Sequence, residues 1–412
     1  MSSKNASENR FLTATLGRLF VANAAPMMLI MMMSGLLTVV DAAFLGHFVG
    51  ADALAAVSVV FPVIMITIAV STIVGGGMSS LLARQFGAGK YSDAMAVFAQ
   101  AHGLAFFLSF LLILAFGIGG GVVIDALTDG QADIARMAYT YLAIMILATP
   151  VQFLLSVHAD AWRNEGRAGL MALMSVGVTV ANIVLNYLLI VHLDMGVAGS
   201  ALGTAIAQGL GLALLVGLRA RGGGRLPLAG LRDFRWVGKW RAILTLGAPV
   251  SLSFIGIALV SATTITTLRV TSGTGYVEGI AAYGIVTRIF SFTFMPLMAI
   301  ALATQSIVGN NVGAKLYQRS NAVLRLALTV SVVYCGAVEV ILLAGHGWIG
   351  RAFVTDVDVI AQVGKILRPM ASLYFVAGPV LVLAMYFQAI GKLGHTAALT
   401  LIKPFLLRLR TH

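Results

Sequence analysis

Long runs of apolar residues with very few charges dominate this chain. The first run, Leu19 to Phe48, reads LFVANAAPMMLIMMMSGLLTVVDAAFLGHF, and Asp41 is the only formally charged side chain between Arg18 and His47. A helix of about 20 apolar residues spans the hydrocarbon core of a bilayer, so this run is long enough to cross. Only 10% of all residues are charged, compared with about 25% in soluble domains. We therefore predict an all-α polytopic membrane protein.

Further apolar runs follow the first, and basic residues gather in alternate connections between them. Because cytoplasmic loops carry an excess of Lys and Arg, this asymmetry places the amino terminus in the cytoplasm and the protein in the cell (inner) membrane. The predicted spans are 19–46, 52–82, 94–123, 134–158, 168–191, 196–218, 243–268, 279–308, 320–345 and 359–388.

The net charge of +12 does not indicate a nucleic-acid partner, because the basic residues lie in short connections rather than on one soluble domain. The single cysteine, Cys335, excludes an internal disulfide and a cysteine metal site. The sequence also lacks a phosphate-binding loop with lysine, an HExxH pattern and a nucleophile with its base. We therefore expect neither an enzyme nor a resident cofactor or metal.

An internal repeat organises the chain. Segments around Pro26 recur around Pro249, LAAVSVVFP at Leu54 recurs as IAAYGIVTR, and QFGAGKY at Gln85 recurs as NVGAKLY, in the same order and with nearly constant spacing. An even number of spans separates the copies, so both halves should have the same orientation in the membrane. This predicts two six-helix lobes, 1–220 and 243–412, joined by a cytoplasmic linker at 221–242.

The carboxyl end departs from this repeat. After Gly394 the chain reads HTAALTLIKPFLLRLRTH, which is interrupted by Lys403 and Pro404 and is shorter than the roughly 20 residues that a span needs. We therefore expect the second lobe to be incomplete, with the last one to two helices missing and about 10 to 11 of 12 spans present.

Asp41 is the first candidate functional residue. A carboxylate is costly inside hydrocarbon unless water or a partner receives it. Met27, Ser34 and Asp41 are spaced two helical turns apart, so they share one face of the helix, as expected for the wall of a cavity. An alternative stays open: Asp41 is about 34 Å along the helix from Arg18, so it could lie at the outer headgroups.

Two later spans carry paired polar residues. Asn182 and Asn186 are four residues apart in the fifth span, and Thr204 and Gln208 repeat that spacing in the sixth. Such side chains commonly hydrogen-bond across membrane helices without another role. Together with Asp41 they would instead supply oxygen ligands for a small cation, or hydrogen-bond partners for a protonatable acid. Tyr139 and Tyr141 in the fourth span are candidates to complete this cluster.

Other residues suggest hinge and substrate roles. Pro26 removes a backbone hydrogen bond in the first span and is a candidate hinge, while Met27 and Met31 suit a surface that accepts varied apolar ligands. Arg288 is a candidate counter-charge or substrate contact, and Glu339 is a second acid within a span, without a partner that the sequence identifies. Asp160 and Glu165 flank Arg163 near a predicted inner loop, and we expect them to form a solvated contact.

The ordered set of motifs resembles the multidrug and toxic compound extrusion (MATE) family over nearly the whole chain. The resemblance implies twelve helices in two lobes and export of amphipathic, often cationic compounds in exchange for protons or sodium ions. The motifs are Pro26 with Asp41, QFGAGKYSDA, RNEGR followed by ANIVLN, GVAGSALGTAIAQ and ATQSIVGNNVGA.

The resemblance also implies roles for individual residues. Asp41 matches the family's acid in the first lobe, Asn182 its asparagine in span five, Thr204 its hydroxyl in span six and Tyr141 its tyrosine in span four. Asn186 stands where some members have a second carboxylate, which favours a proton over Na⁺ at Asp41 and Asn182 as the coupling ion.

The expected protein is therefore a proton-coupled antiporter, a monomer among membrane lipids, with Met27, Met31, Ser34, Gln208 and Arg288 as substrate-cavity candidates. Two alternatives remain: a flippase for a lipid-linked precursor, and a truncated remnant that does not transport.

Overall fold

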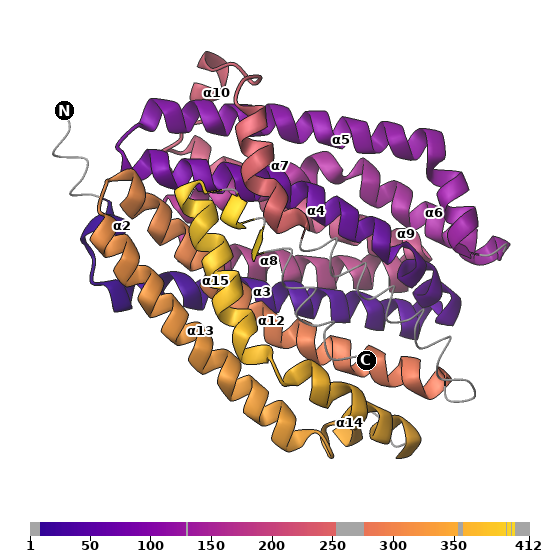
Figure 1. Ribbon diagram of the computed structural model, residues 1–412. Coiled ribbons are helices and arrows are strands. Elements are labelled where there is room, and N and C mark those ends of the chain that lie inside the picture. Colours follow the sequence, from indigo (N-terminus) through magenta and orange to yellow (C-terminus); the bar gives the residue numbers. More distant parts are fainter. Residues whose placement is uncertain are drawn as a thin grey trace.

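A computed structural model describes residues 9–128, 131–252, 276–352, 357–392, 394–396 and 398–399, and every regular element in these ranges is a helix (Figure 1). Most of the helices run roughly parallel to one another. The first half comprises α2 (Arg10–Thr13), α3 (Leu16–Phe44), η1 (Leu45–Val49), α4 (Ala51–Gly87), α5 (Tyr91–Thr128), α6 (Ala132–Leu147), α7 (Thr149–Asn164), α8 (Ala168–Asn186), η2 (Tyr187–His192) and α9 (Gly196–Ala220).

The second half follows the same plan. Residues 240–252 are helical, and the rest of the predicted span 243–268 lies outside the described residues, as do residues 400–412, on which the expected truncation depends. The remaining elements are α10 (Gly230–Asp233), α12 (Tyr276–Gly313), α13 (Tyr317–Gly345), η4 (Ile349–Ala352), α14 (Val357–Ala371) and α15 (Tyr374–Ile390).

Among the described residues, seven helices are long and apolar enough to cross a membrane, and two bent helix pairs raise the number to nine. The predicted spans 134–158 and 359–388 are these pairs: α6 meets α7 at 46°, and α14 meets α15 at 47°. Pro150 explains the first break because it has no N–H to donate. The Thr149 hydroxyl instead donates to the carbonyl oxygen of Ile146 at 2.7 Å.

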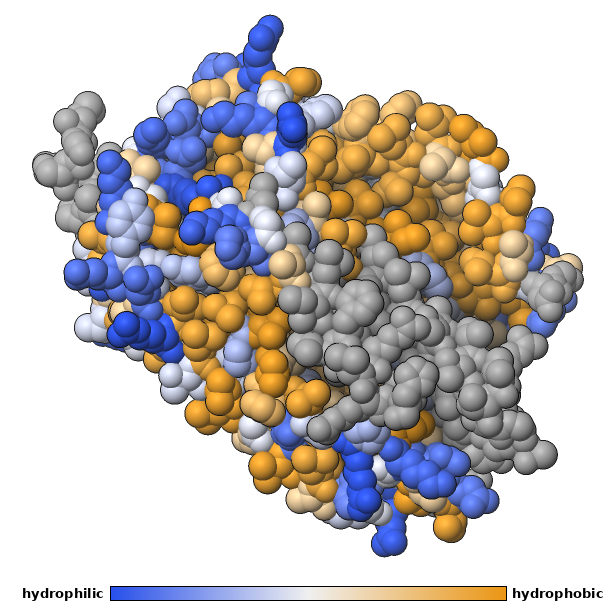
Figure 2. Space-filling model, viewed as in Figure 1, coloured by the Kyte–Doolittle hydropathy of each residue, from blue (hydrophilic) through white to orange (hydrophobic). Residues whose placement is uncertain are grey.

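The surface has the character expected of a protein surrounded by lipid. Apolar residues cover much of the face in Figure 2, and hydrophilic residues gather toward the ends of the helices. Large apolar side chains stand fully outward, including Ile118, Val122 and Leu173, each 70% exposed or more. The prediction of a multi-pass, all-α membrane protein is therefore confirmed.

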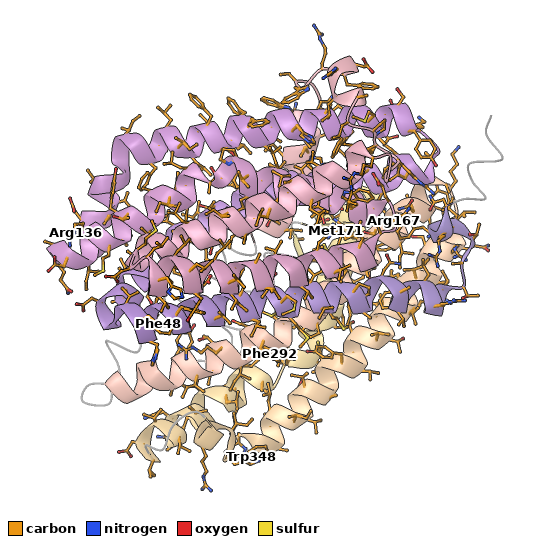
Figure 3. The ribbon with its side chains drawn as sticks, turned by 180° about the vertical axis from the view of Figure 1, so that it is seen from behind. Phe48, Arg136, Arg167, Met171, Phe292 and Trp348 are labelled. Atoms are coloured by element: carbon orange, nitrogen blue, oxygen red, sulfur yellow. The ribbon has the colours of Figure 1, made fainter. Side chains whose placement is uncertain are left out.

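The ends of the helices define two faces. Arg167, at the start of α8, lies at the end of the molecule near the amino terminus, whereas Arg136 and Phe48 lie at the opposite end (Figure 3). We call these the N-terminal face and the far face. Successive spans cross the molecule in opposite directions. The helices that end at the N-terminal face are therefore α4, α7, α9, α12 and α15.

Helix α3 belongs to both halves of the molecule. Near the N-terminal face, Leu19, Phe20 and Ala24 are buried in one apolar cluster with Ile300 and Ile307 of α12. Beyond Pro26, the helix packs along α8 of the first half. Contacts of α3 with α12 continue past Pro26, since a Cβ atom added to Gly35 would lie 2.5 Å from the side chain of Met295, so α3 lies between the two halves.

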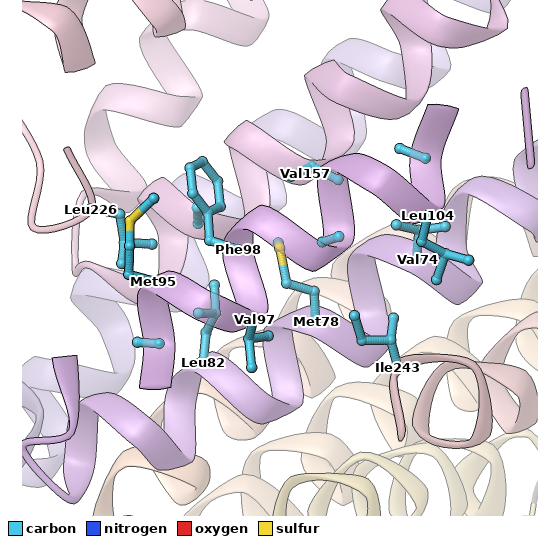
Figure 4. Close-up of a cluster of buried hydrophobic side chains, with 14 of the residues drawn as sticks. Val74, Met78, Leu82, Met95, Val97, Phe98, Leu104, Val157, Leu226 and Ile243 are labelled. Atoms are coloured by element: carbon cyan, nitrogen blue, oxygen red, sulfur yellow. The ribbon is translucent and has the colours of Figure 1, made fainter. Parts of the chain in front are cut away.

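The first helix of the second half, which includes residues 240–252, likewise packs against both halves of the molecule. Ile243 is buried in the core of the first half together with Val74, Met78 and Phe98 (Figure 4), whereas Val250, just after Pro249, is buried with Leu297 and other residues of the second half. Pro26 and Pro249 are 223 positions apart, which is the spacing of the sequence repeat.

The two halves touch most closely where α4 meets α12 at the N-terminal face. A Cβ atom added to Gly87 would lie 1.8 Å from the backbone oxygen of Asn310, and one added to Gly313 would lie 2.0 Å from the backbone oxygen of Arg84. Both pairs join repeat-related positions, since Gly87 corresponds to Gly313 and Arg84 to Asn310. Glycine is required here because the helix backbones are in direct contact.

We predict that Gly87→Ala lowers the apparent melting temperature in detergent, because the added methyl group must push α4 away from α12. Overpacking of this kind costs about 1–3 kcal/mol. The matched control is Gly117→Ala in α5, where an added Cβ meets nothing within 4 Å. Equal melting temperatures for the two variants would contradict the close contact.

Candidate functional site

Asp41 lies in the last turn of α3 and is hydrogen-bonded to two helices of the first half. Asn186 Nδ2 donates to Asp41 Oδ1 at 2.5 Å, and the Thr204 hydroxyl donates to Asp41 Oδ2 at 3.5 Å. Asn186 ends α8, and Thr204 lies on α9, so three helices meet at one carboxylate. Asp41 therefore has protein partners.

Asn182 links the other members of the cluster. It lies one turn before Asn186 on α8; its Nδ2 donates to the Thr204 hydroxyl at 3.1 Å, and its Oδ1 accepts from Asn186 Nδ2 at 3.1 Å. The i, i+4 spacing read from the sequence explains why both amides point to the same side of α8. Each amide forms a hydrogen bond with a neighbouring polar atom that would otherwise be buried without a partner.

The side-chain amide of Asn182 can face Asp41 in two ways. The amide atom closest to the carboxylate lies 2.9 Å from Asp41 Oδ1. If that atom is nitrogen, it donates to an ionised carboxylate, and the amide oxygen accepts from the hydroxyl of Thr204 at 3.1 Å and from its backbone N–H at 3.2 Å. If it is oxygen, it accepts from Asn186 Nδ2 at 3.1 Å, and it accepts a hydrogen bond from Asp41 as well only when Asp41 is protonated, because two bare acceptors repel. The favoured orientation thus depends on the protonation of Asp41.

Burial limits how much of this cluster is accessible from outside. Asn182 and Asn186 are fully buried, and Thr204 is 7% exposed, whereas Asp41 is half-buried. The carboxylate is therefore the member of the cluster that an ion can reach from outside. A buried, hydrogen-bonded set of this kind is strongly oriented, since each unpaired polar atom would carry a desolvation penalty.

Two further predicted residues lie beside the cluster. Tyr141 of α6 is buried in an apolar cluster with Ala138 and Leu142 and is close enough to interact electrostatically with Asp41. In the part of the chain that the structure describes, no hydrogen bond joins the two. Gln208, one turn after Thr204 on α9, is half-buried.

The substrate-cavity candidates on α3 occupy different environments. Met27 is 4% exposed, Met31 is half-buried and Ser34 is exposed, with its hydroxyl donating to the Ile30 carbonyl oxygen at 3.0 Å. The face of α3 that was predicted to line a cavity is therefore not uniformly exposed. Arg288 is exposed on α12, a helix of the other half, and Pro26 lies inside α3 as predicted.

Sequence reasoning missed Gly203 and Ser200 on α9. A Cβ atom added to Gly203 would lie 2.4 Å from Asn186 Oδ1, so the absence of a side chain there makes room for the amide that donates to Asp41. Ser200 is fully buried one turn before Thr204. The small residues of GVAGSALGT at four-residue spacing were a usable signal, because small side chains let membrane helices approach closely.

A second polar network joins the two halves nearer the N-terminal face. Ser79 of α4 accepts hydrogen bonds from Arg163 and Asn164, both at 2.8 Å, and donates to Gln305 of α12 at 3.4 Å. Gln305 in turn donates to Gln388 of α15 at 2.7 Å. The network holds α4 and α7 of the first half against α12 and α15 of the second.

The expectation of a solvated contact around Arg163 is wrong. Arg163 pairs with Asp160 at 2.9 Å with little exposure of either side chain, and Glu165 pairs with Arg219 at 2.6 Å in a site that is almost completely buried. Arg219 also lies over the ring of Trp162. The reason is the folding of the loop after α9 over this region: the backbone oxygen of Leu226 accepts from Arg219.

The structure gives Glu339 a partner. Its Oε2 accepts from the backbone N–H of Phe375 at 2.8 Å. Phe375 is the second residue of α15, directly after the break from α14. The first N–H groups of a helix have no partner within the helix, so Glu339 satisfies one that the break exposes.

Comparisons with known proteins agree with the helical fold. The model of the MatE family matches residues 26–188 and 249–409. The Bacillus subtilis protein "Probable multidrug resistance protein YoeA" is 25% identical over 358 residues, 84% of this chain and 75% of that protein. Human "Multidrug and toxin extrusion protein 1" is 26% identical over 85% of this chain, which spans 60% of the human protein. "Crystal structure of MATE in complex with MaL6" matches with a TM-score of 0.86 and 22% identity, covering 98% of this chain and 89% of that one.

We predict that Glu339→Ala speeds hydrogen exchange of the amides that begin α15, because the Phe375 N–H loses its acceptor. Loss of such a cap typically costs about 0.5–2 kcal/mol. Glu339→Gln is the matched control, since its amide oxygen can still accept the bond. Unchanged exchange in Glu339→Ala would show that the hydrogen bond contributes nothing to the start of α15.

Proposed function

This chain belongs to the MatE family, and we propose that it exports amphipathic, often cationic compounds by alternating access in exchange for protons. The observation that supports the proposal most directly is the buried cluster of Asn182, Asn186 and Thr204 around the accessible carboxylate of Asp41. The relatives named for multidrug resistance and for multidrug and toxin extrusion support the direction of transport by analogy.

In this proposal, protonation of Asp41 is coupled to the orientation of the Asn182 side-chain amide. With Asp41 ionised, the amides of Asn182 and Asn186 both donate to Oδ1. When a proton binds Oδ1, that atom becomes a donor toward Asn182, whose amide then presents its oxygen, and its nitrogen donates to Thr204. Proton binding thus changes the bonds that hold the last turn of α3 to α8 and α9.

A change at Asp41 can reach the substrate through α3. The helix is attached to the first half around Asp41 and to the second half around Phe20, with Pro26 between them. We propose that Pro26 acts as the hinge and that loosening of the Asp41 bonds bends α3. The candidate cavity side chains Met27, Met31, Ser34, Gln208 and Arg288 would then change their exposure to bound substrate.

Sodium is the alternative coupling ion. Asp41, the Asn182 and Asn186 amide oxygens and the Thr204 hydroxyl are hard oxygen donors of the kind that small cations prefer. Asn186 Oδ1 is buried without a hydrogen-bond partner in the described structure, which makes it an available ligand. The proton is favoured because Asn186 already donates its N–H to Asp41, and an N–H cannot coordinate a cation.

We propose that the N-terminal face is cytoplasmic and that the protein works as a monomer in the cell membrane. The distribution of Lys and Arg along the connections supports this orientation. Substrates are amphipathic small molecules, and membrane lipids are the surrounding partners. No metal or organic cofactor is part of the proposed mechanism.

We predict that Asp41→Asn abolishes gradient-driven uptake of a fluorescent lipophilic cation into inside-out vesicles, because the variant has no group to protonate. Separately imposed proton and sodium gradients identify the coupling ion. Asp52→Asn, an equivalent change at an exposed acid in the first turn of α4, is the control. Full uptake by Asp41→Asn would refute coupling at this residue, and absence of uptake by the parent chain under both gradients would favour a lipid flippase or an inactive remnant.

We predict that Gly203→Ala lowers uptake about tenfold, the kinetic equivalent of about 1.4 kcal/mol, because the new methyl group displaces the Asn186 amide. Gly209→Ala on the same helix, where an added Cβ meets only Val151 at 4.0 Å, should transport like the parent chain. Equal uptake by both variants would show that the position of Asn186 is not needed for coupling.

A further inference from the structure

Helix α5 shows at which depth the hydrocarbon of the membrane begins. The large apolar side chains that α5 exposes begin at Phe106 and end at Leu127. The distance between these two residues along the helix is about 32 Å, close to the roughly 30 Å thickness of a hydrocarbon core. Between Ala94 and Ala105, by contrast, most side chains of α5 are buried. Phe106 therefore lies at the boundary of the hydrocarbon that is nearer the N-terminal face.

The linker between the two halves is fixed against α5 just beside this boundary. Helix α10 packs on α5 and stands out from its side in Figure 1. The backbone N–H of Lys239 donates to Gln100 Oε1 at 3.0 Å, and Trp240 Nε1 donates to the Gln100 backbone oxygen at 3.0 Å. A Cβ atom added to Gly103 would lie 2.2 Å from the Trp236 backbone oxygen, so the backbones of linker and helix touch. The linker thus presents a surface of defined shape.

Two tryptophans of the linker lie on the apolar side chains at the boundary. The ring of Trp236 stacks on that of Phe106, with ring centres 5.9 Å apart and planes at 12°, and the ring of Trp240 lies 5.3 Å from that of Phe107. Both indole N–H groups donate to backbone oxygens, while Trp236 remains 40% exposed. Tryptophan is enriched where membrane meets water. The pair therefore places this part of the linker at the level of the lipid headgroups.

Basic side chains surround the two tryptophans. Asp233 is the only acid between residues 221 and 250. In the part of the chain that the structure describes, the basic residues of this stretch closest to the tryptophans form no ion pair. These four residues, all exposed and all within ten positions, are Arg232, Arg235, Lys239 and Arg241. We call them the linker cations. Cations at the headgroup level attract the phosphates of anionic lipids.

We propose that the linker cations bind an anionic phospholipid, with phosphatidylglycerol as the occupant. The headgroup phosphate lies among the linker cations, and an acyl chain follows the exposed apolar side of α5 that begins at Phe106. A zwitterionic lipid carries its own cation beside the phosphate, whereas phosphatidylglycerol has a net negative charge that the linker cations neutralise. This site is separate from the Asp41 cluster and goes beyond the proposed transport function.

The surroundings of the linker cations favour a lipid over a soluble anionic partner. The cations border an exposed aromatic and apolar surface formed by Trp236, Val237, Phe106 and Phe110. A soluble polyanion would leave that surface uncovered, whereas a phospholipid covers it with an acyl chain while its phosphate meets the cations. Both parts of the ligand are thus matched at one depth.

Tryptophan quenching tests the site, because bromine on a lipid acyl chain quenches only nearby tryptophans. Trp348→Phe removes another exposed tryptophan, and Trp162, 1% exposed, is shielded from lipid, so Trp236 and Trp240 report. The full chain is reconstituted in mixed bilayers of phosphatidylcholine and phosphatidylglycerol, with one or the other lipid brominated near its headgroup. The lipid exchange constant should favour phosphatidylglycerol about fivefold, the equivalent of about 1 kcal/mol.

Replacing all four linker cations by glutamine should bring the exchange constant close to one. The matched control removes the same charges elsewhere in the chain, from three exposed arginines and one exposed lysine, and should keep the preference. Its substitutions are Arg10→Gln, Arg18→Gln, Lys315→Gln and Arg325→Gln. A third variant, with lysine at the three arginine positions of the linker cations, retains their charge and should also keep the preference.

Equal quenching by the two brominated lipids before any linker cation is replaced would overturn the proposal and leave these cations to a soluble anionic partner. That comparison needs no change at the site, so it holds even if the glutamine variant fails to fold. A preference that survives in the glutamine variant, or that is lost equally in the matched control, would also overturn it. Quenching does not require transport, so the result is independent of whether the chain exports its proposed substrates.

Discussion

The hydrogen bonds of Asp41 to Asn186 and Thr204 are the interaction on which the proposed function depends. They fasten one end of α3 to the first half of the molecule, whereas the other end is buried in the second half with Phe20. A helix held at both ends by different bodies transmits any change in one attachment to the other. In the proposed mechanism, protonation of the acid at one attachment therefore alters the bonds that position the helix.

The internal repeat gives this arrangement its symmetry, but the chemistry of the two halves differs. Pro26 and Pro249 are repeat-related, and each lies in a first helix that packs against both halves. Glu339, an acid on α13 of the second half, instead caps α15 at the break in its span. Among the described residues, Asp41 is thus the acid that joins α3 to both neighbouring helices of the first half, while Glu339 supports a bend within the second.

Much of this fold was predictable because a bilayer leaves few options for a chain that must satisfy its backbone hydrogen bonds internally. Long apolar runs therefore indicated helices, and the i, i+4 amides indicated the face of α8 that meets Asp41. Two features were not predictable from single residues. The crossing of α3 into the opposite half depends on packing between segments about 280 positions apart, such as Phe20 and Ile300. The buried pairing of Arg219 with Glu165 depends on a loop that looked solvated.

The same reasoning explains why glycine is important at two distant places. At Gly203 the missing side chain admits the amide of Asn186 and so shapes the proposed ion site, whereas at Gly87 and Gly313 it allows the backbones of α4 and α12 to touch. The first role requires a fixed, close fit, since the hydrogen bonds around Asp41 depend on it. Under the proposed alternating access, the second is a contact that breaks, and backbone surfaces without interlocking side chains separate without repacking a core. In the proposed mechanism, one residue type thus serves both a fixed hydrogen-bonded cluster and a contact that opens.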